Sequence, residues 1–98
     1  MDALRRLQDW YLVNCNGDWE HSYGIEIGTL DNPGWSLKVD LAGTPCAGRV
    51  LMETSVGDSD TDASWCVCRV VENRYESFGG PLMLETMIGQ FLEWAAPN

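Results

Sequence analysis

The segment 18–21 places the only histidine of the chain beside two carboxylates. A carboxylate and an imidazole act as a general acid–base pair when both reach the same proton. Neighbouring side chains on an extended segment diverge, and neither Ser22 nor Cys15 stands in a motif that activates a nucleophile. We therefore expect no catalytic residues and no enzyme. A small metal-dependent hydrolase that uses Glu20 and His21 is the weaker alternative.

Three aspartates, Asp58, Asp60 and Asp62, alternate with small polar residues, as at the start of an EF-hand calcium loop. That loop continues with Gly at its sixth position and Glu at its twelfth, where this chain has Ala63 and Arg69. The pattern therefore favours a solvated acidic turn or a contact with a basic partner. We expect neither metal nor cofactor.

The chain has four cysteines, but it lacks the paired C-x-x-C spacing of a structural zinc site. Cys66 and Cys68 stand two apart on a predicted strand, so their side chains share one face at a separation that suits a mutual disulfide poorly. Reduced, mostly buried thiols are the favoured interpretation, with metal ligation and disulfides as alternatives.

Five tryptophans are many for 98 residues, and a small domain needs such side chains for its core. Four of them stand on or beside predicted helices and strands. Trp19 instead stands between Asp18 and Glu20 in a predicted loop, 15–21. Because binding hot spots are rich in tryptophan, Trp19 is the candidate anchor for a partner. The alternative is that Trp19 packs against the sheet, while Asp18 and Glu20 bind turn amides or face solvent.

The first half of the chain predicts one helix and a hairpin. Apolar residues at helical spacing predict a helix over 2–14, and Asn16-Gly17 can end it. Alternation predicts a strand over 23–27 and a clearer one over 35–41. The turn DNPG at 31–34 connects them, since Pro presets one dihedral angle and Gly accepts a positive one.

The second half predicts three more strands and a helix: 49–56, 65–71, 75–78 and an apolar stripe over 84–95. Short connections between strands favour an antiparallel meander. Both helices have one apolar side, which the sheet must cover. We therefore predict an α+β fold: an antiparallel sheet of about five strands flanked by an N-terminal and a C-terminal helix, in a single domain, 1–98.

Charge excludes several classes of partner. Fifteen acidic residues against six basic ones give a net charge of −9, and no Lys or Arg occurs between Leu7 and Leu37. A nucleic-acid binder must neutralise phosphates with Lys and Arg, and an anionic membrane requires the same, so we expect neither partner. A protein with a basic surface fits this charge, which also keeps a small domain in solution.

No apolar run approaches the roughly 20 residues that cross a bilayer. The first 12 residues carry four charges and no small-residue cleavage site, so they are not a secretory signal. These observations favour a cytoplasmic protein.

Several motifs resemble the immunity protein 53 family, in order along nearly the whole chain. They are LQDWYL at 7–12, NGDWEHSYGI at 16–25, TLDNPGWS at 29–36, GGP at 79–81 and FLEW at 91–94. Residues 49–62 and the two cysteines Cys66 and Cys68 lie outside these motifs.

The resemblance implies a non-catalytic antidote of a bacterial polymorphic toxin system, which neutralises a cognate toxin in the cytoplasm. An acidic antidote fits a cationic toxin groove, so we expect partner contacts at two acidic clusters, Asp18, Trp19 and Glu20 in one and Asp58, Asp60 and Asp62 in the other. The alternative outside this family is a small acidic adaptor or regulatory module.

Overall fold

The computed structural model describes residues 2–57 and 63–96, which form an α+β fold. The elements in chain order are α1 (Ala3–Asn14), α2 (Trp19–Ser22), β1 (Ile25–Leu30), β2 (Gly34–Asp40), β3 (Thr54–Val56), β4 (Cys66–Val71), β5 (Arg74–Gly79) and α3 (Leu84–Ala95). Five antiparallel strands and the two long terminal helices confirm the predicted architecture. No helix in the described ranges is both long and apolar enough to cross a bilayer.

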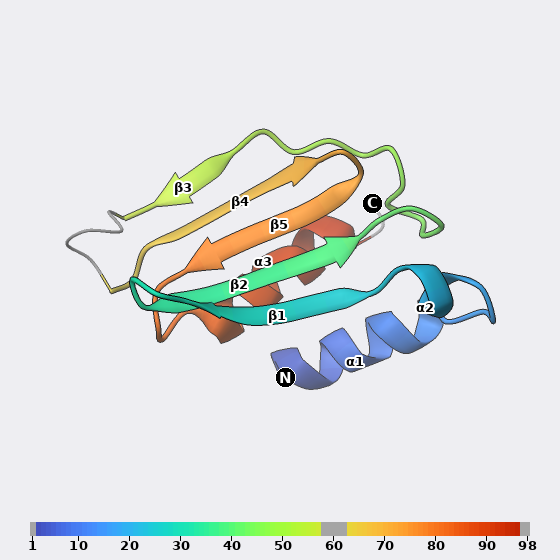
Figure 1. Cartoon of the computed structure of the whole chain (residues 1–98), viewed down its shortest axis with the longest axis horizontal. Coiled ribbons are helices and arrows are strands. Elements are labelled where there is room, and N and C mark those ends of the chain that lie inside the picture. The colour runs from blue at the N-terminus through green and yellow to red at the C-terminus, as the bar shows by residue number, and fades with distance from the viewer. Residues whose placement is uncertain (1, 58–62, 97–98) are drawn as a thin grey trace.

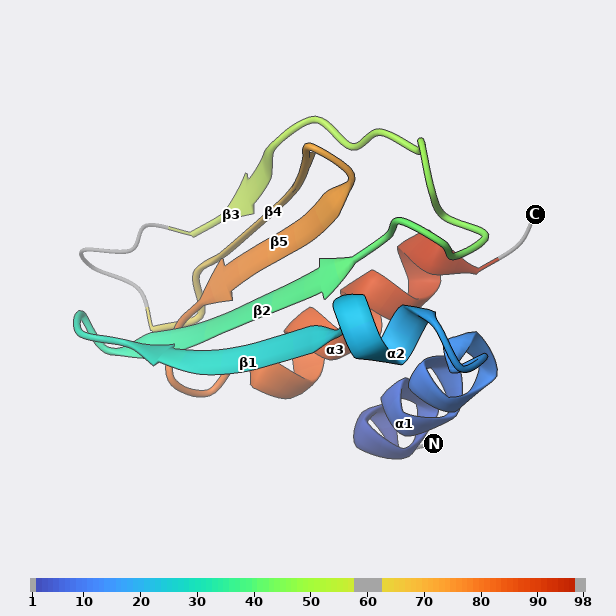
Figure 2. The ribbon, with the colours of Figure 1, turned by 45° about the vertical axis from the view of Figure 1, so that its right-hand side comes forward.

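The strand order is β1-β2-β5-β4-β3, so the sheet is not the simple meander that short connections suggested. After β2 the chain crosses to the far edge to form β3, and the β4–β5 hairpin then fills the gap beside β2. Both long helices lie on one side of the sheet, α3 behind its centre and α1 towards the β1 edge (Figures 1 and 2). Among the described residues, the opposite face carries no helix.

Every second side chain of β2 and β5 points to the face of the sheet that α3 covers. Leu37, Val39 and Tyr75 are fully buried beneath α3, as the predicted alternation of β2 requires. From α3, Phe91 lies edge-to-face against Tyr75 at 4.9 Å and against Trp10 of α1 at 5.0 Å. This aromatic contact joins both helices to the sheet, and such pairs add to the free energy gained by burial.

Two turns depend on particular residues. In the β4–β5 hairpin Glu72 and Asn73 both have positive φ, 51° and 64°, as a two-residue turn that follows the twist of the strands requires. At the start of β2, Gly34 lies directly against the backbone of Gly79, where a Cβ would collide with the carbonyl group. Only glycine permits this close approach of β2 and β5.

The predicted strand 49–56 is wrong in its first part, because β3 contains only Thr54–Val56. Arg49 turns its guanidinium to the C-terminal end of α3, where Nη2 donates to the Trp94 carbonyl oxygen at 2.6 Å. Leu51 makes one isolated backbone bond, accepting from Val70 at 3.1 Å. The side chain of Arg49 thus binds the end of α3, and continuous pairing with β4 begins only at Thr54.

The start of the hairpin also differs from the prediction. The one-turn helix α2 begins inside the expected loop 15–21, and the first strand covers Ile25–Leu30 rather than 23–27. Tyr23 ends α2 instead, since its backbone N–H donates to the Trp19 carbonyl oxygen at 2.8 Å.

Candidate partner-binding surface

Side chains of the α1–α2 connection fix its shape by local hydrogen bonds. The Asn16 side-chain oxygen accepts from the backbone N–H groups of Asp18 and Trp19, both at 3.0 Å. The Glu20 carboxylate accepts from the N–H groups of Asn16 and Gly17, at 2.9 and 2.8 Å. Gly17 has φ of 92°, which favours glycine. The connection is therefore preorganised, and it holds the Asp18 backbone in one place on the surface.

Trp19 lies in the core, so it is not an exposed anchor for a partner. Its side chain is 3% exposed. The indole packs edge-to-face against Trp10 at 6.0 Å and Tyr11 at 5.7 Å, both on α1. Since α1 buries this ring, Trp19 anchors α2 to the fold. Its contribution to the candidate surface is to position the carboxylates on either side of it.

Those two carboxylates have different environments. Asp18 is exposed and makes no capping hydrogen bond to α2. The pKa of Glu20 lies below the usual 4.5, mainly because its own backbone N–H donates a hydrogen bond to the carboxylate. Desolvation raises this pKa, and the hydrogen bonds from the N–H groups of Asn16 and Gly17 lower it further. A carboxylate held ionised in this way is a weak proton acceptor at neutral pH. Glu20 therefore suits the role of a fixed negative charge better than that of a general base.

The second predicted cluster, Asp58, Asp60 and Asp62, lies outside the described residues, in the connection between β3 and β4. Because β1 and β3 run in the same direction, the end of β3 and the start of β1 lie at opposite ends of the sheet (Figure 1). Val56 and α2 are consequently far apart. The described strand that precedes the second cluster in the sequence therefore ends far from the first cluster.

The open face of the sheet carries a ladder of ion pairs that sequence patterns did not identify. Two arginines each bridge two carboxylates: Arg69 bridges Glu53 and Glu76, both at 3.0 Å, and Arg74 bridges Glu26 at 3.4 Å and Asp40 at 3.1 Å. Phe78 lies between two cations, with Arg69 5.4 Å and Lys38 6.0 Å from its ring centre. Three of the six basic residues thus lie on this face, and the negative charge of the chain is concentrated elsewhere.

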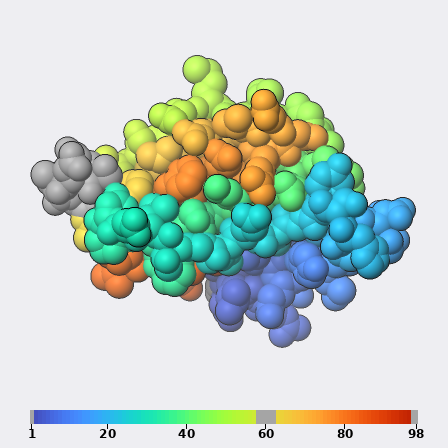
Figure 3. Space-filling model, in the orientation of Figure 1, coloured from blue at the N-terminus to red at the C-terminus, as the bar shows by residue number. Residues whose placement is uncertain are grey.

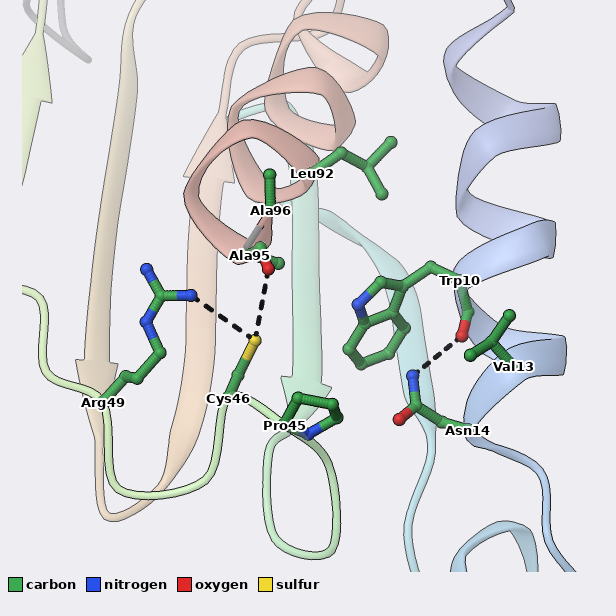
Figure 4. A pocket seen from close by; sticks show the side chains of 9 residues that line it. All are labelled: Trp10, Val13, Asn14, Pro45, Cys46, Arg49, Leu92, Ala95 and Ala96. Atoms are coloured by element: carbon green, nitrogen blue, oxygen red, sulfur yellow. Dashed lines mark hydrogen bonds between the residues drawn. The ribbon is translucent and has the colours of Figure 1, made fainter. Parts of the chain in front are cut away.

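A cavity of about 350 Å³ lies where the ends of α1 and α3 meet the turn 44–49 (Figure 4). Its lining is mostly apolar, and Arg49 is its charged residue. The Arg49 guanidinium stacks 4.4 Å above the Trp94 ring while it binds the Trp94 carbonyl oxygen. Its charge therefore stabilises the C-terminal end of α3. The cavity contains no pair of groups arranged for acid–base chemistry.

A second hollow, shallow and apolar, lies between α1 and β1, which form neighbouring bands of the molecular surface (Figure 3). Leu7, Gln8, Tyr11 and Leu12 of α1 and Ile25 of β1 line it. We call it the α1–β1 groove. Tyr11 and Leu12 are exposed along its rim, so apolar side chains face solvent beside a sheet edge.

The cysteines and acidic residues do not assemble into a metal site in the described part of the chain. All four cysteines are free thiols, of which Cys46 and Cys66 are buried. Within 2–57 and 63–96, no three His, Cys, Asp or Glu side chains lie close enough to hold a metal ion.

Comparison with known proteins gives one match. A family model described as immunity protein 53 matches residues 4–96. Neither a curated protein nor a solved structure matches the chain. The matched range covers α1 except its first residue, α2, α3, the whole sheet and both acidic clusters.

Proposed function

Because the chain belongs to the immunity protein 53 family, we propose that it binds a cognate bacterial toxin domain and neutralises it by covering the groove in which the toxin acts. The match over 4–96 is the observation that carries this proposal. The antidote acts in the cytoplasm of a cell with a polymorphic toxin system, and it makes and breaks no covalent bond.

The charge distribution supports a basic partner surface. The net charge is −9, and the arginines Arg69 and Arg74 are each occupied by two carboxylates. Opposite charge on two proteins speeds their encounter and disfavours wrong partners. A toxin that acts on a polyanion presents such a cationic groove, and an acidic protein competes for it directly.

The proposed contacts are the two acidic clusters. Asp18 is exposed on a loop that hydrogen bonds hold in shape, with Glu20 beside it and Trp19 beneath. A preordered loop loses little conformational entropy when a partner binds. Asp58, Asp60 and Asp62 follow β3 in the sequence, and the described end of β3 lies at the opposite end of the sheet from α2.

Protection of a cell requires that almost no toxin remains free. We therefore expect a one-to-one complex with a dissociation constant of about 1 nM or below, which corresponds to about −12 kcal/mol. Buried contacts at the centre supply most of this free energy, while charges at the rim mainly raise the association rate.

The experiment is co-expression of the chain with the toxin domain encoded beside it, followed by purification through a tag on the toxin. We expect a stable one-to-one complex and toxin that is inactive while bound. A toxin that stays active and does not retain the chain would contradict the proposal.

Calorimetry on variants then tests the acidic contacts. Changing Asp58, Asp60 and Asp62 together to Asn should weaken binding and reduce its salt dependence, and Asp18→Asn should do the same to a smaller extent. The double change Glu85→Gln and Glu93→Gln on the exposed side of α3 is the matched control. These variants remove three, one and two negative charges, so losses of affinity that simply follow the number of charges removed would mean that only total charge matters.

A further inference from the structure

The free edge of β1 has unpaired backbone groups, and the register identifies them. The backbone N–H of Asp40 donates to the Gly24 carbonyl oxygen at 3.0 Å, so Gly24 and Asp40 form a hydrogen-bonded pair. On the other side of β2, Leu41 bonds to Asn73 in the same way. Since bonded pairs alternate in an antiparallel ladder, even-numbered residues of β1 bond to β2. The outward N–H and C=O groups belong to Ile25, Ile27 and Thr29.

This edge lacks the features that usually prevent strand pairing. Natural sheet edges are protected by Lys, Pro or a very short strand. β1 has six residues and contains neither Lys nor Pro, whereas β3 at the other edge has only three residues. In the described ranges β2 is the only strand that pairs with β1. An added strand therefore finds outward hydrogen-bonding groups at every second residue.

The α1–β1 groove lies along the same edge and adds apolar surface. Its volume is about 420 Å³, and Leu12 on its rim is 69% exposed. Side chains at alternate positions of a strand point to the same face. A strand added to β1 therefore directs every second side chain towards this groove, next to Ile27, which is itself exposed.

The charge around the β1 edge indicates which kind of strand could bind there. No Lys or Arg occurs between Leu7 and Leu37, the stretch that contains the groove, α2 and β1. Asp18 precedes the strand and Asp31 follows it. Glu26 lies on the strand, and its side chain stays 70% exposed beside Arg74 at 3.4 Å. A second copy of this chain would bring the same negative charges together, at −9 for each molecule. A basic strand is attracted to the same edge.

We propose that the free edge of β1 accepts an extended segment of the toxin as a sixth strand, with apolar side chains in the α1–β1 groove and basic side chains near Glu26 and the acidic residues at both ends. This inference rests on the proposed function and names its contact surface. Backbone hydrogen bonds supply affinity, and the groove and the acids supply specificity.

The test is Ile27→Pro in the full chain, with Ile27→Val as the matched control. Proline removes the outward N–H of residue 27 and leaves the bonds of Glu26 and Gly28 to β2 in place. We expect Ile27→Pro to weaken toxin binding on the order of 100-fold, while Ile27→Val binds within about threefold of the original chain.

Amide hydrogen exchange of the unmodified protein gives a second measurement of the edge, and it does not depend on whether a variant folds. In the free chain the amides of Ile25, Ile27 and Thr29 should exchange fast, and in the toxin complex they should become protected. Fast exchange in the complex, or full affinity of folded Ile27→Pro, would overturn the inference while toxin binding by the unmodified chain still supports the function. The inference would also be overturned if the free chain formed a dimer that Ile27→Pro dissociates, because the edge would then bind a second copy of the chain.

Discussion

The two faces of the sheet differ in what their side chains do. The covered face is apolar and aromatic, and its central residues Leu37, Val39 and Tyr75 are inaccessible to solvent. The open face is polar and charge-balanced, with Arg69 and Arg74 each between two carboxylates. Burial stabilises the first face strongly, whereas partly exposed ion pairs contribute little to the second. Stability therefore depends on one face, and the open face and the edges tolerate changes of sequence.

This difference bears on recognition. An antidote must keep its fold while its contacts adapt to one toxin, so the residues that bind and those that stabilise are best kept apart. Trp19 and Asp18 illustrate this separation within two adjacent residues, since the indole is buried against α1 and the carboxylate is exposed. The proposed contacts, at the edge of β1 and at exposed acids, would leave the aromatic core intact.

The two phenylalanines of the chain give the largest test, because Phe91 of α3 packs on the covered face and Phe78 of β5 lies on the open face. Phe91→Ala removes a fully buried ring that contacts Tyr75 and Trp10, and it should lower the free energy of unfolding by about 3–5 kcal/mol. Phe78→Ala removes a half-buried ring between two cations and should cost about 1–2 kcal/mol. Denaturant unfolding measures both, and equal losses would contradict the division between the faces.

The next effect is a loss of stability in alkali that originates from the covered face. Burial, with a smaller effect of the neighbouring Cys68 thiol, raises the pKa of Tyr75 above its usual 10. The stabilisation is complete below pH 10 and is lost as pH rises towards the folded-state pKa, because only the unfolded chain ionises there. The loss should reach about 1.4 kcal/mol for each pH unit above 10.

Tyr75→Phe should remove this part of the alkaline dependence, and Tyr23→Phe, which changes an exposed ring, should not. Thermal unfolding between pH 8 and pH 11 compares the variants. The same alkaline slope in all three proteins would show that the Tyr75 hydroxyl is not a buried group.

The smallest effect belongs to the open face. Glu53→Gln removes a partner of Arg69 whose own side chain is 59% exposed, so we expect a loss below about 1 kcal/mol that shrinks as salt is added. Glu76→Gln removes the less exposed partner of the same arginine and should cost more. A loss of several kcal/mol for Glu53→Gln would mean that the open face also stabilises the fold.

Sequence patterns predicted the elements whose burial is periodic. The helix at 2–14, the strand at 35–41 and the stripe at 84–95 correspond to α1, β2 and α3, because each presents one apolar side to the core. The error at 49–56 arose because Arg49 binds the end of α3, a contact between distant residues that strand propensity does not contain.

The candidate site was predicted less completely. Acidic composition identified Asp18 and Glu20, but the burial of Trp19 depends on Trp10 and Tyr11, which only the folded chain brings beside it. The ion pairs of Arg69 and the free edge of β1 depend on strand order and register. A single strand's alternation specifies its two faces but not its neighbours. The exposure of Leu12 on α1 points to a binding surface only because the fold places Leu12 beside the free edge of β1.

Titration of toxin activity with purified protein tests the central claim most directly. If the chain neutralises its toxin by covering it, activity falls linearly and ends at one molecule of chain per toxin. Mass spectrometry then finds the toxin unmodified, and activity returns once the complex is denatured and the toxin is refolded alone. Inactivation of many toxin molecules by one chain, or a covalent change in the toxin, would contradict the account.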